Sequence, residues 1–69
     1  METQKINEMV RLERLKQRKR LYDVRVNTGI DEARLSRYEN GQIELPIEDL
    51  TRVFKALKID IKLLEGAKK

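Results

Sequence analysis

The sequence contains no cysteine and no histidine, and each absence narrows the chemistry open to it. Without cysteine there is no disulfide framework. Zinc and haem sites lose their usual ligands, and nucleophilic catalysis of the Ser/His or Cys/His kind has no histidine to act as base. We therefore expect no enzyme, no metal site and no cofactor.

Aromatic residues, proline and long apolar runs are also scarce. Aromatic residues make up 4% of the 69 residues, and proline occurs once. No apolar run approaches the roughly 20 residues of a membrane-spanning helix, and no apolar signal core follows the first charges. This length allows one domain, residues 1–69, with a core at about residues 7–65 and frayed ends. We expect a cytoplasmic protein with no membrane partner.

Charge, by contrast, is abundant: 41% of the residues are charged and the net charge is +4. Residues 1–28 hold eight basic and four acidic residues and so carry the whole excess, whereas residues 29–41 are net negative by one. The densest basic stretch is Lys16-Gln17-Arg18-Lys19-Arg20. Two interpretations stay open for it: a basic helix C-terminus favoured by the helix dipole, or a patch that faces phosphate.

Helical periodicity predicts two helices in the first 29 residues. A helix from about residue 7 to residue 19 carries one apolar stripe, formed by Ile6, Met9, Val10, Leu12 and Leu15. A second helix starts at Leu21 and ends at Gly29, which serves as a left-handed cap. The alternation over residues 24–29 also fits a short strand, but a strand without a partner is unstable.

Three further helices have clearer boundaries. Asp31 caps a helix over residues 32–40 that buries Leu35 and Tyr38 and stops at Gly41. A loop follows, and Pro46 then opens a helix whose apolar face comprises Ile47, Leu50, Val53, Phe54 and Leu57. Asp60 caps a short fifth helix that carries Ile61, Leu63 and Leu64. The pattern predicts an all-α domain with a helix-turn-helix between its second and third helices.

Three segments resemble the Cro/repressor-type, or lambda-repressor-like, helix-turn-helix family. They are Thr28-Gly29-Ile30, then Leu35-Ser36-Arg37-Tyr38-Glu39-Asn40-Gly41, and then Leu50 with the stretch from Val53 to Ile59. The resemblance covers roughly residues 10–65. It implies a compact five-helix DNA-binding domain whose third helix enters the major groove.

The resemblance also assigns roles to individual residues. Bases would be contacted by Glu32, Ala33, Ser36 and Arg37. Arg37 is favoured for a specific contact, because a guanidinium can bond both acceptors of guanine, and a surface ion pair is its alternative. Phosphate would be bound by Asn40 and by the backbone amides near Gly41 and Gln42. Arg34 would lie at the groove edge or contact a phosphate. Glu39 would pair with a basic residue of the first helix, either Lys16 or Arg14.

The chain departs from the family pattern where its first two helices join. The usual glycine is absent there, and Leu21 takes the place of a glutamine that contacts phosphate. We assign that contact instead to Arg18, Lys19 and Arg20. Arg25 and Phe54 stand where the family has small residues, and we expect the arginine stem and the ring to fill space left by a shifted second helix.

Together these features predict a sequence-specific regulator that binds double-stranded DNA, a repressor acting as a homodimer on a palindromic operator. The predicted dimer surface consists of Ile59, Ile61, Leu63 and Leu64. One alternative is an antitoxin or anti-regulator whose main partner is another protein, such as a toxin or a second regulator. A pure protein-interaction module is the other alternative. Asp31 and Glu32 at the groove-entering end favour it, whereas Ser36, Arg37 and Asn40 beside the basic patch argue against it.

Overall fold

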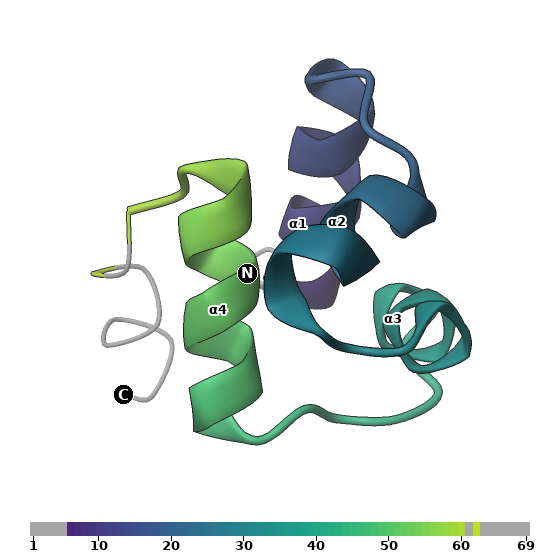
Figure 1. Ribbon diagram of the computed structural model, residues 1–69. Helices are drawn as coiled ribbons and strands as arrows, with labels where there is room; N and C mark the ends of the chain where they lie inside the picture. The colour runs from purple at the N-terminus through teal and green to yellow at the C-terminus, as the bar shows by residue number, and fades with distance from the viewer. Residues whose placement is uncertain (1–5, 61, 63–69) are drawn as a thin grey trace.

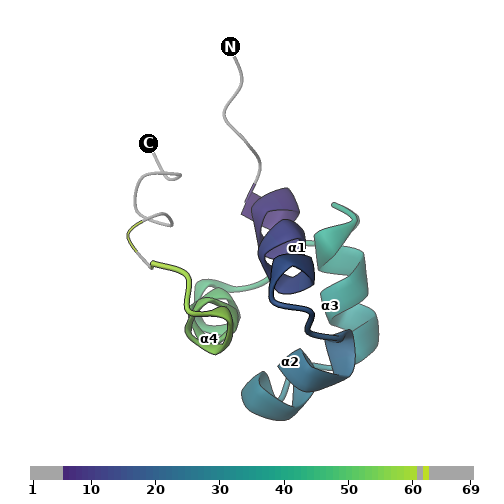
Figure 2. The ribbon, with the colours of Figure 1, turned by 90° about the horizontal axis from the view of Figure 1, so that it is seen from above.

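The computed structural model describes residues 6–60 and residue 62, and this part of the chain folds as four α-helices without a strand. The helices are α1 (Ile6–Lys16), α2 (Leu21–Thr28), α3 (Glu32–Glu39) and α4 (Ile47–Leu57). Helix α2 packs against both α3 and α4, and α1 packs against the same two helices (Figures 1 and 2). The all-α class is confirmed. The predicted fifth helix falls mainly on residues outside those described.

One core cluster joins all four helices and the two loops that flank α3. Its buried members are Val10, Val24, Ile30, Leu35, Tyr38, Leu45, Val53, Phe54 and Leu57. The loop residues Ile30 and Leu45 were not predicted for the core, because they lie outside any helical period. No helix in the described part of the chain is long and apolar enough to cross a bilayer.

Helix α1 turns a different face inward from the one predicted. Val10 is buried, and Ile6 and Met9 pack against the core, but Leu12 and Leu15 are 54% and 47% exposed. The prediction of a single apolar stripe is therefore wrong for the second half of α1. Polar side chains lie on the inward side there: Arg14 of α1 bonds to α3, and Gln17, directly after the end of α1, bonds to α4.

Helix α1 also ends at Lys16, three residues earlier than predicted. Arg18 adopts a left-handed conformation with φ of 59°, which glycine usually supplies at a helix end. The N–H of Arg18 donates to the carbonyl of Leu15 at 2.9 Å, and the N–H of Lys19 donates to that of Arg14 at 3.0 Å. These two bonds form a Schellman motif. The connection to α2 is thus accommodated without a glycine.

Helix α2 starts at Leu21 as predicted, and the alternative of a strand over residues 24–29 is wrong. The Asp23 carboxylate accepts a hydrogen bond from the N–H of Arg20 at the start of the helix, at 2.8 Å. At its end Gly29 has a φ of 80°. The Thr28 hydroxyl donates to the carbonyl of Val24 and accepts from the N–H of Ile30, which fixes the turn into α3.

The predicted ends of α3 are confirmed to within one residue. Asp31 caps it by accepting a hydrogen bond from the N–H of Ala33 at 3.0 Å. The helix ends at Glu39, and Gly41 follows with a φ of 77°. Helix α4 begins directly after Pro46, but Ile47 is 42% exposed and does not belong to the apolar face predicted for it.

The last four carbonyls of α4 all have hydrogen-bond donors, although a helix end leaves them without intrahelical partners. Two donors come from the backbone: Lys58 N–H bonds to Lys55 at 3.2 Å, and Ile59 N–H bonds to Phe54 at 2.8 Å. Two come from the α1–α2 connection: Gln17 Nε2 bonds to the carbonyl of Leu57 at 2.6 Å, and Lys19 Nζ bonds to that of Ala56 at 3.2 Å. The connection therefore caps α4.

Lys58 closes α4 in the left-handed conformation, with φ of 59°. This conformation is unfavourable for any residue with a Cβ and free of that penalty for glycine. We expect Lys58→Gly to raise the free energy of unfolding by about 0.5–1 kcal/mol. Lys55→Gly, inside the same helix, should lower it by about 1 kcal/mol. Denaturation in urea measures both, and destabilisation by Lys58→Gly would contradict the αL assignment.

Candidate nucleic-acid interface

Helix α3 carries the four residues predicted to contact bases. The start of α2 lies beside this helix (Figures 1 and 2). Ala33 and Arg37 are exposed, whereas Glu32 and Ser36 are half-buried. The four positions are spaced at i, i+1, i+4 and i+5, which places them on one face of a helix. The four residues therefore share one face of α3, and their contact with bases stays a prediction.

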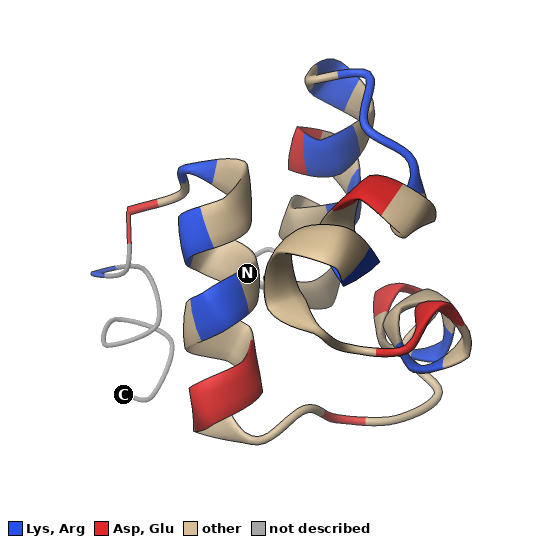
Figure 3. Cartoon of the chain, in the orientation of Figure 1, with Lys and Arg blue, Asp and Glu red and all other residues tan. Residues whose placement is uncertain are grey.

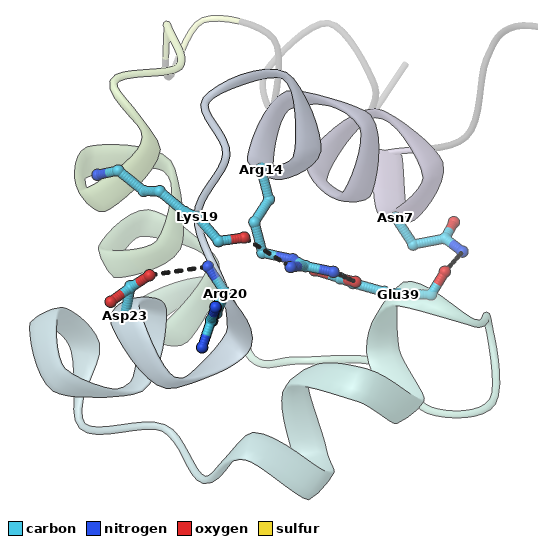
Figure 4. Close-up of polar contacts among 6 residues, drawn as sticks. All are labelled: Asn7, Arg14, Lys19, Arg20, Asp23 and Glu39. Atoms are coloured by element: carbon cyan, nitrogen blue, oxygen red, sulfur yellow. Dashed lines mark hydrogen bonds and ion pairs between the residues drawn. The ribbon is translucent and has the colours of Figure 1, made fainter.

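The end of α3 is fixed by a buried ion pair with α1 (Figure 4). Arg14 donates from Nε to Glu39 Oε2 at 2.7 Å and from Nη2 to Oε1 at 3.0 Å, so the pair is bidentate. The two side chains are 11% and 6% exposed. The partner of Glu39 is thus Arg14, and the alternative of Lys16 is wrong. Arg14 Nη1 also donates to the carbonyl of Lys19 at 2.8 Å, which ties the connection to both helices.

The loop after α3 was predicted to bind phosphate, but its backbone N–H groups are used within the chain. Asn40, Gly41 and Gln42 donate to the carbonyls of Ser36, Tyr38 and Arg37, respectively, at 2.8–3.1 Å. Asn7 Nδ2 holds the same end of α3 by donating to the carbonyl of Glu39 at 3.3 Å (Figure 4). These three N–H groups therefore already have acceptors within the chain, and their contribution to phosphate binding stays a prediction. The exposed side chains of Asn40 and Gln42 carry the donors that remain.

Cations of neighbouring helices compensate the acidic residues of α3. Besides the buried pair of Glu39, Glu32 accepts from Arg25 Nε of α2 at 3.3 Å. Arg34, predicted at the groove edge, forms an ion pair with Asp49 of α4, with Nη2 at 3.3 Å from Oδ2. Arg37 forms no ion pair with any residue between 6 and 60 or with residue 62, so the surface ion pair weighed for it is wrong within this part of the chain.

The three basic residues assigned to phosphate do not share one direction. Basic residues gather at the end of α1 and in its connection to α2, and others lie along α4 (Figure 3). Arg18 and Arg20 are exposed. Lys19 is half-buried, and its side chain points away from that of Arg20 toward the end of α4, where it bonds to Ala56 (Figure 4). Of the three residues, Lys19 is therefore the least available for a phosphate contact.

Arg25 and Phe54 do not fill a common space, and the prediction that they compensate each other is wrong. Phe54 is fully buried in the core cluster. The Arg25 side chain is 43% exposed and lies over the Tyr22 ring, with Cζ 4.9 Å from the ring centroid. The contact of Arg25 with Glu32 was not predicted from the sequence. The available signal was the spacing of the two residues, opposite charges seven positions apart across the turn between α2 and α3.

Of the residues predicted to form the dimer surface, the structure describes only Ile59. It is half-buried and packs against the core. Ile61, Leu63 and Leu64 lie outside the described residues. Asp60, the predicted cap of the fifth helix, accepts a hydrogen bond from the N–H of Lys62 at 2.9 Å.

Tyr38, on the inner face of α3, has an unusual titration. Burial and, to a smaller extent, the negative charge of Glu44 raise the pKa of Tyr38 to about 12. The unfolded chain releases the Tyr38 proton near pH 10, whereas the folded chain holds it until about pH 12. The contribution of the protonated Tyr38 to the free energy of unfolding is therefore complete below about pH 10 and is lost as the pH rises toward 12. We expect the free energy of unfolding to fall more steeply over this range than in Tyr38→Phe, as measured by denaturation at several pH values. Parallel decreases would contradict the shift.

The fold and this surface define a helix-turn-helix module. A comparison with protein-family models matches the helix-turn-helix family to residues 10–64, and the chain belongs to this Cro/C1-type family. Searches of curated proteins and of solved structures give no significant match. Membership of the family indicates a DNA-binding transcription regulator.

Proposed function

We infer that the chain is a sequence-specific repressor that binds double-stranded DNA as a homodimer through α3. The observation that carries this proposal is Arg37, which is exposed on α3 and forms no ion pair with any described residue. The other charges of α3 are neutralised by α1, α2 and α4. Electrostatic repulsion of phosphate by α3 is thereby reduced, and the guanidinium of Arg37 stays available for a guanine.

Phosphate binding in this proposal comes from exposed side chains around α3. Arg20 stands directly before α2, whose start lies beside α3, and Arg18 occupies the turn before it. Asn40 and Gln42 offer neutral donors at the opposite end of α3, and such donors fix the register on DNA without selecting a sequence. Arg34 and Lys19 would first have to leave Asp49 and Ala56.

The homodimer follows from the size of the module. A single module of this family contacts about half of an operator, and pairing through a two-fold axis supplies the surface that specific binding requires. Ile59, Ile61, Leu63 and Leu64 remain the proposed dimer residues. A two-fold axis through the dimer would give a palindromic operator.

The proposal is tested by selecting bound sequences from a random duplex pool. A palindromic consensus is expected for the native chain. Arg37→Ala should relax the preference at one base position per half-site, at a cost of about 1–3 kcal/mol, whereas Arg20→Ala should weaken all sequences similarly and reduce the salt dependence of binding. Arg11→Ala, which removes an exposed positive charge from the outer side of α1, serves as the matched control.

Two outcomes would contradict this function. The first is a chain that selects no consensus sequence. The second is an affinity for DNA that barely changes with salt, since phosphate contacts release counterions and make binding depend on salt. Stable capture of a protein partner together with either result would favour the antitoxin or anti-regulator alternative.

A further inference from the structure

Three side chains form an exposed bridge between the two helices of the helix-turn-helix. Arg25 of α2 lies over the ring of Tyr22, one turn earlier in the same helix, at 4.9 Å from its centroid. From there its Nε donates to Glu32 Oε2, in the first turn of α3, at 3.3 Å. The guanidinium is thus held by the ring on one side and by the carboxylate at its edge.

This bridge contributes little to the stability of the fold. The side chains of Arg25 and Glu32 are 43% and 45% exposed, and exposed ion pairs stabilise proteins weakly. The cation–π contact is also exposed, because Tyr22 has 54% of its surface in solvent. The buried pair of Arg14 and Glu39 stabilises the fold, whereas stability does not explain this exposed bridge. We therefore consider a role in function.

The position of Glu32 suggests that role. It is the first residue of α3, and in the proposed complex this end of the helix enters a groove bordered by phosphates. A free carboxylate would be repelled there, and Arg25 supplies the compensating charge from α2. The bond to Arg25 uses Oε2 and leaves Oε1 without a partner among the described residues. A carboxylate oxygen in the major groove can accept a hydrogen bond from the N4 amino group of cytosine.

We propose that Arg25 is a positioning residue for DNA recognition, which neutralises Glu32 and orients it to accept a hydrogen bond from a cytosine. This inference rests on the proposed function, because it requires α3 to lie in the major groove. It adds to that function a specificity element outside the recognition helix. Tyr22 supports it by limiting where the guanidinium can lie.

The test compares sequences selected from a random duplex pool by the native chain, Arg25→Gln, Glu32→Gln and the double variant. The native chain should prefer cytosine at one position of each half-site by about tenfold, and both single variants should reduce that preference to about twofold or less. The double variant should lose no more than either single variant, since the two residues act as one unit. Preferences at the other positions should persist in all variants.

A matched control removes another exposed arginine from an ion pair. Arg52→Gln breaks the contact of Arg52 Nη1 with Oδ1 of Asp49, three residues earlier in α4, at 3.8 Å and should leave the selected sequence unchanged. Thermal unfolding followed by circular dichroism should give similar midpoints for all these variants, because both arginine side chains are exposed and exposed charges contribute little to stability. A purely structural role of Arg25 would move the midpoint and not the base preference.

The outcomes separate this inference from the function on which it rests. Retention of the cytosine preference by Arg25→Gln, together with its loss in Glu32→Gln, would overturn the role of Arg25. Absence of any cytosine preference in the native chain, with a position still sensitive to Arg37→Ala, would overturn the inference and leave the function standing. A native chain that selects no consensus at all would overturn both.

Discussion

Replacing Glu39 by glutamine is expected to lower the free energy of unfolding by about 3 kcal/mol or more, because it leaves the charge of Arg14 unpaired in a site that is almost closed to water. A domain of this length has a total stability of roughly 3–10 kcal/mol, so the loss would be a large part of it. Urea denaturation followed by circular dichroism measures the change.

Glu32→Gln is the matched control, since it removes the same charge from an exposed pair and should cost less than about 1 kcal/mol. The double variant Arg14→Met with Glu39→Leu should recover much of the loss, because apolar side chains of similar size remove the buried charge altogether. Equal costs for Glu39→Gln and Glu32→Gln would show that the Arg14–Glu39 pair is open to solvent.

Replacing Phe54 by alanine should cost about 3–5 kcal/mol, the other large effect expected in this domain. Phe54 has no exposed surface and belongs to the cluster in which all four helices meet, so truncation leaves a cavity at their common centre. The same denaturation experiment measures it, and thermal unfolding should show a much lower midpoint.

Leu12→Ala on α1 provides the contrast for this variant. The sequence predicts Leu12 to be as buried as its neighbours, whereas the structure leaves it 54% exposed. The substitution should therefore change the free energy of unfolding by only about 0.5 kcal/mol. A cost near that of Phe54→Ala would mean that Leu12 is covered, either within the domain or by a second chain.

Helix boundaries were largely predictable, because their signals are local. Asp31 caps α3 through an N–H two residues away, and Gly29 and Gly41 take left-handed conformations directly after helices. The one boundary that was misplaced lies where the local signal is weak. Arg18 adopts the same left-handed conformation without being glycine, and the bonds of the connection to α3 and α4 hold the chain there.

The placement of the candidate base-contacting residues on one face of α3 was predictable from the sequence, and their ion pairs were not. The residues of α3 that face outward follow from helical spacing. The ion pairs of these residues do not follow from spacing. Arg34 and Arg37 are alike in the sequence, and Arg34 has a partner only because the fold brings Asp49 of α4 close to it. The same holds for the loop after α3, whose amides were predicted to bind phosphate and which donate to carbonyls of α3 in the structure.

The sequence by itself determined the all-α class, the order of the four described helices, the turn between α2 and α3, and the family to which the chain belongs. These depend on residues within a few positions of one another. Only the tertiary structure decided which face of α1 turns inward, since the groups that require its donors lie 25 residues away in Glu39 and 40 residues away in Leu57. Arg14 and Gln17 satisfy a buried carboxylate and a free helix-end carbonyl, and because they occupy the inward face, Leu12 and Leu15 are left in solvent.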